Sequence, residues 1–222
     1  MQYAPWSRAV PLACAVGYSV GVPSNEPLPL KTICVYCASS RLCDAAYHAA
    51  ARRTGEVLAE HGYGIVYGGS ANGSMGALAD GALARGGTVR GILPRFMMEL
   101  EWGHPKLTEL RIVEDLRVRK HLMLSESHGL IALPGGCGTL EELFEALTLK
   151  RLGLYVHPIV LLNTRDFFAP LIALLNHAVD ERFMAPQHLD MWQVVYEPEE
   201  IPHALENAPP WSADARKFAA VR

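Results

Sequence analysis

The sequence carries few of the features that mark membrane, nucleic-acid-binding or secreted proteins. One apolar stretch, residues 9–22, is shorter than the roughly 20 residues that a helix needs to span a bilayer. The 20 Lys and Arg residues are offset by 23 Asp and Glu residues, so the net charge of −3 lacks the basic excess of nucleic-acid-binding proteins. Five cysteines, an odd number at scattered positions, do not form a disulfide framework and favour a reducing cytoplasm. We therefore expect a cytoplasmic protein with a small-molecule partner, and neither a nucleic acid nor a membrane as partner.

Motifs for metals and for common cofactors are also missing. Cys34 and Cys37 form a C-x-x-C pair inside the apolar run 33–37, but no second Cys or His pair accompanies them, so we expect buried strand cysteines rather than a metal or redox site. The nine His residues show no metal-ligand spacing. Neither glycine-rich loop fits G-x-G-x-x-G, and Ser74 stands where a phosphate-binding loop of an NTPase has Lys. The sequence therefore predicts no metal and no cofactor.

What the sequence does contain is typical of an α/β protein. Of its 222 residues, 50% are hydrophobic and 19% are charged, which is enough apolar material for one well-filled core. From Leu30 onward, short β-branched runs alternate with longer stretches whose apolar residues recur every three to four positions. Strands are predicted at Lys31–Cys37, Gly64–Tyr67, Thr88–Leu93, Leu110–Val113, Gly129–Leu133 and Pro158–Leu162. Helices are predicted at Asp44–His61, Ser74–Arg85, Asp115–Ser127, Leu140–Leu152 and Phe167–Glu181.

This alternation predicts a Rossmann-like, doubly wound, mostly parallel sheet flanked by helices, in a single domain over residues 30–207. Residues 1–29 are expected to be a loosely ordered N-terminal extension, because a lone Arg before a proline-containing apolar run makes a poor signal peptide. Residues 208–222, with two prolines and scattered charges, are expected to be a C-terminal tail.

Two glycine-rich loops follow predicted strands, the place where ligands bind in folds of this class. The first covers residues 67–76 (YGGSANGSMG) and the second covers residues 134–142 (PGGCGTLEE). Each precedes a predicted helix, whose free N–H groups and dipole suit a phosphate. The alternative is that the glycines only permit tight turns. Two such loops in one sheet favour a binding site.

The second loop adds polar side chains that allow two interpretations. Thr139 and Glu142 have the spacing of a capping box, which would stabilise the start of the helix, and a Glu at this position equally suits catalysis. Upstream, Arg117, Arg119 and Lys120 cluster in the first turns of a predicted helix, where cations are mildly unfavourable. The cluster therefore suits an anionic partner, or it forms a solvated basic face.

The run from Pro134 to Glu142 matches the motif P-G-G-x-G-T-x-x-E, and the chain thereby resembles the Lonely Guy (LOG) family of cytokinin riboside 5′-monophosphate phosphoribohydrolases, once labelled lysine decarboxylases. Further stretches agree in order between Lys31 and about Gln193, namely residues 35–40, 67–69, 75–76, 119–120, 152–154 and 161–163. A lysine decarboxylase is not expected, since no lysine site for pyridoxal phosphate is evident.

The resemblance implies hydrolysis of the N-glycosidic bond of a purine nucleoside 5′-monophosphate, AMP or an N6-modified AMP, to free base and ribose 5-phosphate. It implies that Arg119 and Glu142 are the catalytic pair. The substrate-binding residues that it implies are Glu101, Arg119, Lys120, Gly136, Cys137, Gly138, Thr139, Leu140, Glu141, Glu142 and Thr148. It also implies a homodimer, or a higher assembly, with the site near the subunit interface.

Two other functions stay open alongside hydrolysis. The first glycine loop departs from the family pattern at Ser70 and Ser74, which leaves the preferred base open and motivates a nucleotide-binding or sensor protein that uses the same pocket without hydrolysis. A molybdenum-cofactor carrier shares the fold and similar loops, although the pair Arg119 and Glu142 argues against it.

Overall fold

The computed structural model describes residues 31–98, 100 and 103–219. The predicted extension at residues 1–29 and Glu101 lie outside these residues. The described chain forms one sheet of parallel strands in the order β4-β3-β2-β1-β5-β6-β7. The strands are β1 (Lys31–Tyr36), β2 (Tyr63–Tyr67), β3 (Val89–Pro94), β4 (Glu109–Val113), β5 (Leu130–Ala132), β6 (Ile159–Leu162) and β7 (Gln193–Val195). The predicted Rossmann-like parallel sheet is confirmed.

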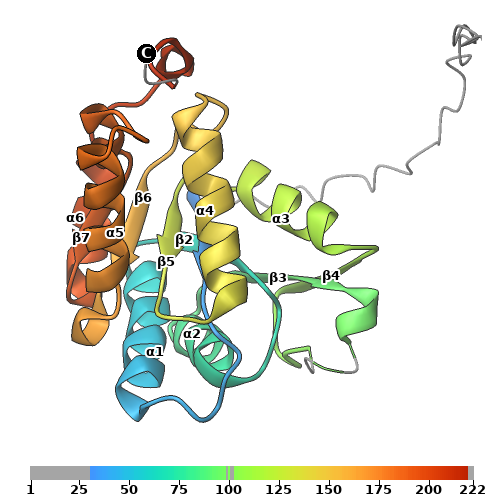
Figure 1. Cartoon of the computed structure of the whole chain (residues 1–222). Helices are drawn as coiled ribbons and strands as arrows, with labels where there is room; N and C mark the ends of the chain where they lie inside the picture. The colour runs from blue at the N-terminus through green and yellow to red at the C-terminus, as the bar shows by residue number, and fades with distance from the viewer. Residues whose placement is uncertain (1–30, 99, 101–102, 220–222) are drawn as a thin grey trace, which may run out of the picture.

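Helices cover both faces of this sheet. One face packs against α1 (Ala45–Glu60), α2 (Gly73–Ala84) and α6 (Ile201–Glu206), and the other against α3 (Leu116–Ser125), α4 (Cys137–Arg151) and α5 (Ala169–Asp180). In Figure 1, α1 and α2 lie together in the lower part of the view, whereas α3 and α4 lie in its upper part. Short 3₁₀ helices connect the elements at Arg95–Met97, Thr164–Asp166, Pro186–Met191, Pro198–Glu200 and Ala213–Lys217.

Strand β1 shows how the sequence pattern builds the two cores. Its side chains alternate between faces, so Ile33 and Val35 pack in the core under α1 and α2, and Cys34 and Tyr36 pack in the core under α3 and α4. Cys37 follows the strand and is also buried. The prediction of buried strand cysteines is confirmed. Because the strand is buried on both faces, its apolar run is continuous rather than alternating.

The predicted elements agree closely with the observed ones. Each predicted strand lies within one residue of its observed bounds, and Asp44 and Asp115 cap α1 and α3 by accepting hydrogen bonds from backbone N–H groups. Strand β7 and helix α6 were not predicted: β7 (QVV) lacks the fully apolar run of the equally short β5 (LIA), and the six residues of α6 span less than two helical turns. The domain bounds at residues 30 and 207 stay a prediction, and Trp211 beyond them packs against the core and donates to the Lys150 carbonyl oxygen at 2.7 Å.

The strand order places the site. From β1 the chain builds outward through β2, β3 and β4, and it then returns to the other side of β1 to continue with β5, β6 and β7. The loops after β1 and β5 therefore leave the sheet on opposite faces and open a crevice between them at the carboxyl ends of the strands. Ligands bind at this switch point in open parallel sheets, so the fold directs attention to the residues that follow Tyr36 and Ala132.

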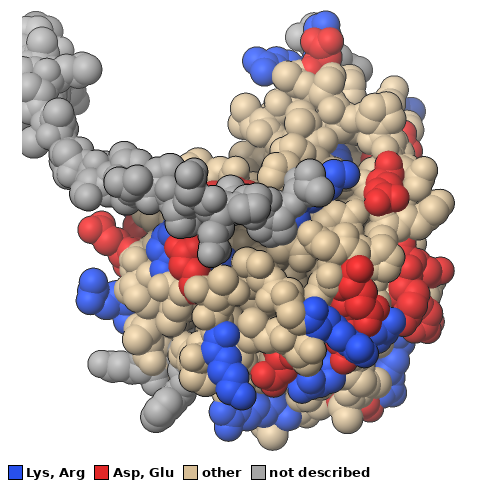
Figure 2. Space-filling view, turned by 180° about the vertical axis from the view of Figure 1, so that it is seen from behind, with Lys and Arg blue, Asp and Glu red and all other residues tan. Residues whose placement is uncertain are grey.

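The charges on the visible surface are mixed in sign (Figure 2). On the face shown in Figure 2, basic and acidic side chains alternate over the described residues and form no continuous basic surface. Several of these charges are paired on α1, where Arg53 contacts Glu56 and Glu60. Within the described ranges, no helix combines the length and the hydropathy that a membrane span requires.

Candidate functional site

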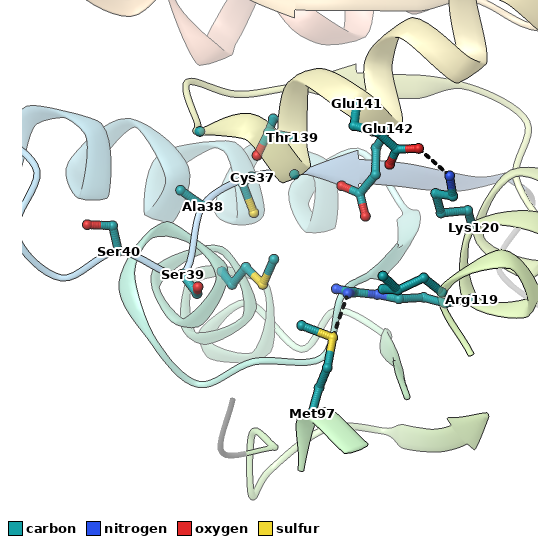
Figure 3. A pocket seen from close by; sticks show the side chains of 14 residues that line it. Cys37, Ala38, Ser39, Ser40, Met97, Arg119, Lys120, Thr139, Glu141 and Glu142 are labelled. Atoms are coloured by element: carbon teal, nitrogen blue, oxygen red, sulfur yellow. Dashed lines mark hydrogen bonds and ion pairs between the residues drawn. The ribbon is translucent and has the colours of Figure 1, made fainter. Parts of the chain in front are cut away.

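A cavity of about 380 Å³ lies at the predicted switch point. Five elements contribute to it: the segment after β1, the N-terminal turns of α4, the start of α3, and, with one methionine each, α2 and the 3₁₀ helix after β3. Its lining residues are Cys37, Ala38, Ser39, Ser40, Met75, Met97, Leu116, Arg119, Lys120, Gly136, Gly138, Thr139, Glu141 and Glu142. Figure 3 shows most of these side chains around a shared space. The volume is within the range of cavities that hold small ligands, about 300–1,000 Å³.

Arg119 on α3 brings a buried positive charge to this cavity. Its side chain is only 3% exposed, and its Nη2 donates to the carbonyl oxygen of Gly68 at 3.2 Å, while Nη1 lies 3.5 Å from Met97 Sδ. Its Nε has no hydrogen-bond partner among the described residues. A buried guanidinium with one carbonyl and one sulfur as partners retains the capacity to bind an anion.

Gly68 is required for this placement. A Cβ atom at residue 68 would lie under 3.0 Å from Arg119 Nη2, closer than real Cβ contacts. The absence of a side chain therefore lets the guanidinium rest on the backbone of the first glycine loop. This loop supports the cavity wall, and of its residues only Met75 lines the cavity.

Glu142 on α4 faces the same cavity from the opposite wall. It is 8% exposed, and Figure 3 shows its carboxylate and the Arg119 guanidinium directed into one space. Cys34 lies beneath both of them in the core. Burial raises the pKa of the Cys34 thiol well above its ordinary value, and the charge of Glu142 adds to this rise while that of Arg119 opposes it. The cavity therefore holds two nearly buried side chains of opposite charge.

Helix α4 begins earlier than the sequence predicts. Its N-cap is Gly136 and its first residue is Cys137, so Thr139 lies inside the first turn and no side chain caps the helix. The capping-box prediction for Thr139 and Glu142 is wrong. The Thr139 side chain instead lies against the backbone of Gly135, where a Cβ would meet its hydroxyl under 3.0 Å. The N–H groups of this first turn have no carbonyl partner within the helix, and they border the cavity.

Lys120 follows Arg119 on α3 and is held by carboxylates of α4. Its ammonium forms an ion pair with Glu141 and a second one, at 3.0 Å, with Glu145. Burial lowers the pKa of Lys120, but the hydrogen bonds and charges of both glutamates outweigh it and hold the pKa above its ordinary value. The three basic residues therefore do not form one patch. Arg119 and Lys120 line the cavity, whereas Arg117 is largely exposed and pairs with Asp115 at 3.1 Å.

Comparisons with known proteins now bear on this geometry. A family model described as "Possible lysine decarboxylase" matches residues 75–205. A cytokinin riboside 5′-monophosphate phosphoribohydrolase of Rhodococcoides fascians is 42% identical over 162 residues, which cover 72% of this chain and 81% of that protein. A protein of the same name from Arabidopsis thaliana is 38% identical over 156 residues, which cover 70% of this chain and 72% of that protein. The chain belongs to the phosphoribohydrolase family.

Among solved structures, the molybdenum cofactor binding protein of Rippkaea orientalis matches with a TM-score of 0.62 at 21% sequence identity. The match covers 79% of this chain and 95% of that one. At this identity the similarity shows a shared fold. Since the family matches carry much higher identity, they place the chain with the phosphoribohydrolases.

The structure groups most of the substrate-binding residues that the family resemblance implied. Seven of them line the cavity, namely Arg119, Lys120, Gly136, Gly138, Thr139, Glu141 and Glu142. Cys137 and Leu140 belong to the same helix but do not line it, and Glu101 lies outside the described residues. Thr148 is exposed farther along α4 and borders a separate hollow with Phe144.

Other lining residues of the phosphoribohydrolase cavity were not predicted. Residues 37–40 come directly after β1, and their position at the carboxyl end of a central strand is a signal that could have identified them. Leu116 and Met97 carry no such signal, because apolar residues that are exposed or partly exposed in a helix are common. In the part of the chain that the structure describes, no group of three or more His, Cys, Asp and Glu residues could hold a metal ion.

Proposed function

We propose that the protein hydrolyses the N-glycosidic bond of an adenine-type nucleoside 5′-monophosphate, AMP or an N6-substituted AMP, and releases the free base and ribose 5-phosphate. One observation carries the proposal: Arg119 and Glu142, nearly buried and opposite in charge, face one cavity whose wall includes the start of α4. The printed names of the relatives, cytokinin riboside 5′-monophosphate phosphoribohydrolases, support it.

The start of α4 supplies the phosphate subsite. The N–H groups after Gly136 and the positive end of the helix dipole attract a dianionic 5′-phosphate. The Thr139 hydroxyl, in the same turn, adds a side-chain donor at the cavity wall. Holding the phosphate there fixes the ribose next to Glu142, which lies one turn farther along the same helix.

Glu142 carries the chemistry at the sugar. Cleavage of a ribosyl C–N bond proceeds through a centre with oxocarbenium character, which a nearby carboxylate stabilises. The carboxylate also accepts a proton from the attacking water, whose oxygen forms the new bond to C1′ as the base leaves with the electron pair of the C–N bond. Arg119 on the facing wall is placed to pair with the anionic substrate.

Thr148 supports a dimeric form of this enzyme. It lies on an exposed face of α4 beside Phe144, which is 40% exposed, and outside the cavity of its own chain. The family resemblance assigns Thr148 to substrate binding, and from this position Thr148 can contact only a substrate that a second copy of the chain holds in a homodimer. Light scattering after size-exclusion chromatography is expected to give twice the 24.3 kDa of one chain, or a multiple of that.

The decisive test replaces Glu142 by Gln, which keeps size and removes charge. Purified wild type is incubated with AMP and, separately, with isopentenyladenosine monophosphate, and free base and ribose 5-phosphate are separated by chromatography. We expect Glu142→Gln to lose at least about a hundredfold in kcat, since a positioned general base contributes about 10²–10⁴. Glu181→Gln, at the exposed end of α5, serves as the matched control and should keep wild-type turnover.

The rates of base release from the two nucleotides show which one is the better substrate. A binding measurement distinguishes hydrolysis from nucleotide binding without hydrolysis. Thermal stabilisation by AMP with no product after long incubation would support a nucleotide-binding protein without hydrolysis. Wild-type turnover in Glu142→Gln would contradict the catalytic assignment.

A further inference from the structure

Two carboxylates of α4 hold the ammonium of Lys120 on α3. Lys120 lines the reaction cavity and also a neighbouring hollow of about 330 Å³ between α3 and α4. Its side chain is 13% exposed, so its ammonium sits in the wall between the two spaces. The hollow is lined further by His121, Leu124, Ser125, Glu145, Leu149, Leu154 and Tyr155.

Its two partners lie on opposite sides of this wall. Glu141 and Glu145 are four residues apart on α4 and so share one face of the helix. Glu141 lines the reaction cavity, as Figure 3 shows with its bond to Lys120, whereas Glu145 lines the hollow and not the cavity. The Lys120 Nζ to Glu145 Oε2 distance is 3.0 Å.

The two ion pairs differ in how easily a substrate can replace them. One ammonium between two carboxylates leaves a local net charge of −1 beside a cavity that is to bind an anionic nucleotide. An incoming anion therefore competes with one carboxylate for Lys120. The Glu141 side chain is 58% exposed and regains water at little cost when it is released, whereas the Glu145 side chain is 39% exposed. Glu141 is therefore the carboxylate that the substrate displaces from Lys120.

We propose that Glu145 is a positioning residue of this site: from outside the cavity it anchors the ammonium of Lys120 in the wall, while Glu141 exchanges its contact for the substrate. The inference rests on the proposed function and extends it to a residue that does not line the reaction cavity. Without Glu145, only Glu141 would hold the Lys120 ammonium, and the ammonium would lose its anchor in the wall as soon as the substrate displaces Glu141.

The test measures kinetics and binding in the full-length chain. In Glu145→Gln the KM for AMP is expected to rise about tenfold with kcat within about twofold, because an interaction that positions the substrate in the ground and transition states alike is lost. Glu145→Asp, which keeps the charge on a shorter side chain, should restore part of the affinity. Glu181→Gln removes an exposed charge elsewhere and should leave KM unchanged.

A double-mutant cycle separates positioning from a general structural effect. In a Lys120→Met background, Glu145→Gln is expected to cause no further rise in KM, since the residue through which it acts is gone. An equal rise in both backgrounds, or a KM in Glu145→Gln that is unchanged or lower, overturns the proposal. If wild type releases no base from either nucleotide, the proposed function fails. The role of Glu145 is then tested by calorimetry, by comparing the dissociation constant of AMP for Glu145→Gln with that of the parent protein, with and without Lys120→Met.

Discussion

Replacing Gly68 by Ala probes the link between the first glycine loop and the charge of Arg119. The backbone of Gly68 does not lie at positive φ, so alanine brings no conformational strain there. The new methyl group instead meets the Arg119 guanidinium and also lies 3.0 Å from Met75 Cε. The substitution therefore moves a side chain of the site without touching the site chemically.

The size of the effect follows from the contact. Ordinary contact of a Cβ begins at 3.4 Å, and the Arg119 Nη2 would lie under 3.0 Å, so the guanidinium must retreat from its place by roughly 1 Å. A displacement of that size in a catalytic group costs on the order of a hundredfold in rate. The hydrogen bond from Nη2 to the Gly68 carbonyl, 3.2 Å long, is lengthened or lost in the same step. A bond of this kind contributes about 1.5–3 kcal/mol, since its donor is charged.

The assay compares kcat/KM for AMP with the midpoint of thermal unfolding. We expect Gly68→Ala to lower kcat/KM by about a hundredfold with a modest loss of stability. Gly86→Ala is the matched control: this glycine has φ of +72° in an open turn directly after α2 and does not line the cavity, so alanine there should reduce stability and leave kcat/KM within about twofold. A Gly68→Ala enzyme with wild-type kcat/KM would refute the inference that this glycine positions Arg119.

Two further predictions concern stability. Leu143 is fully buried in the core under α4, so Leu143→Ala should reduce the free energy of unfolding in urea by about 2–5 kcal/mol. Lys150 is buried with the His157 carbonyl as its hydrogen-bond acceptor at 2.7 Å, and burial lowers the pKa of its ammonium from 10.5 to about 8. Between these values the unfolded chain binds a proton that the folded one does not, so the free energy of unfolding should rise by up to roughly 3 kcal/mol as the pH increases from about 8 to about 10.5. This part of the rise should be absent in Lys150→Met. If the difference in unfolding free energy between wild type and Lys150→Met stays constant across this pH range, the rise does not come from Lys150.

Much of the fold could be predicted because it is encoded locally. Apolar spacing predicted six of the seven strands and five of the six α-helices in the described residues, and the polar residues Asp44 and Asp115 marked two helix starts. The element order then limited the topology to a parallel sheet, since parallel strands need helical crossovers. What stayed hidden locally were short elements such as β7, whose burial depends on neighbours distant in the sequence.

The candidate site, too, could be predicted only in part from the sequence. The sequence by itself determined a glycine-rich turn before α4, an Arg and a Glu of the right types, and a place for them at the carboxyl ends of strands. Only the tertiary structure decided that Arg119 is buried while Arg117 stays exposed, that α4 begins at Cys137 rather than after Thr139, and that Thr148 lies outside the cavity. The physical reason is that spacing specifies conformation along one segment. The direction of a charged side chain is set by groups that meet it from elsewhere, here the carbonyl of Gly68, 51 residues away in the chain.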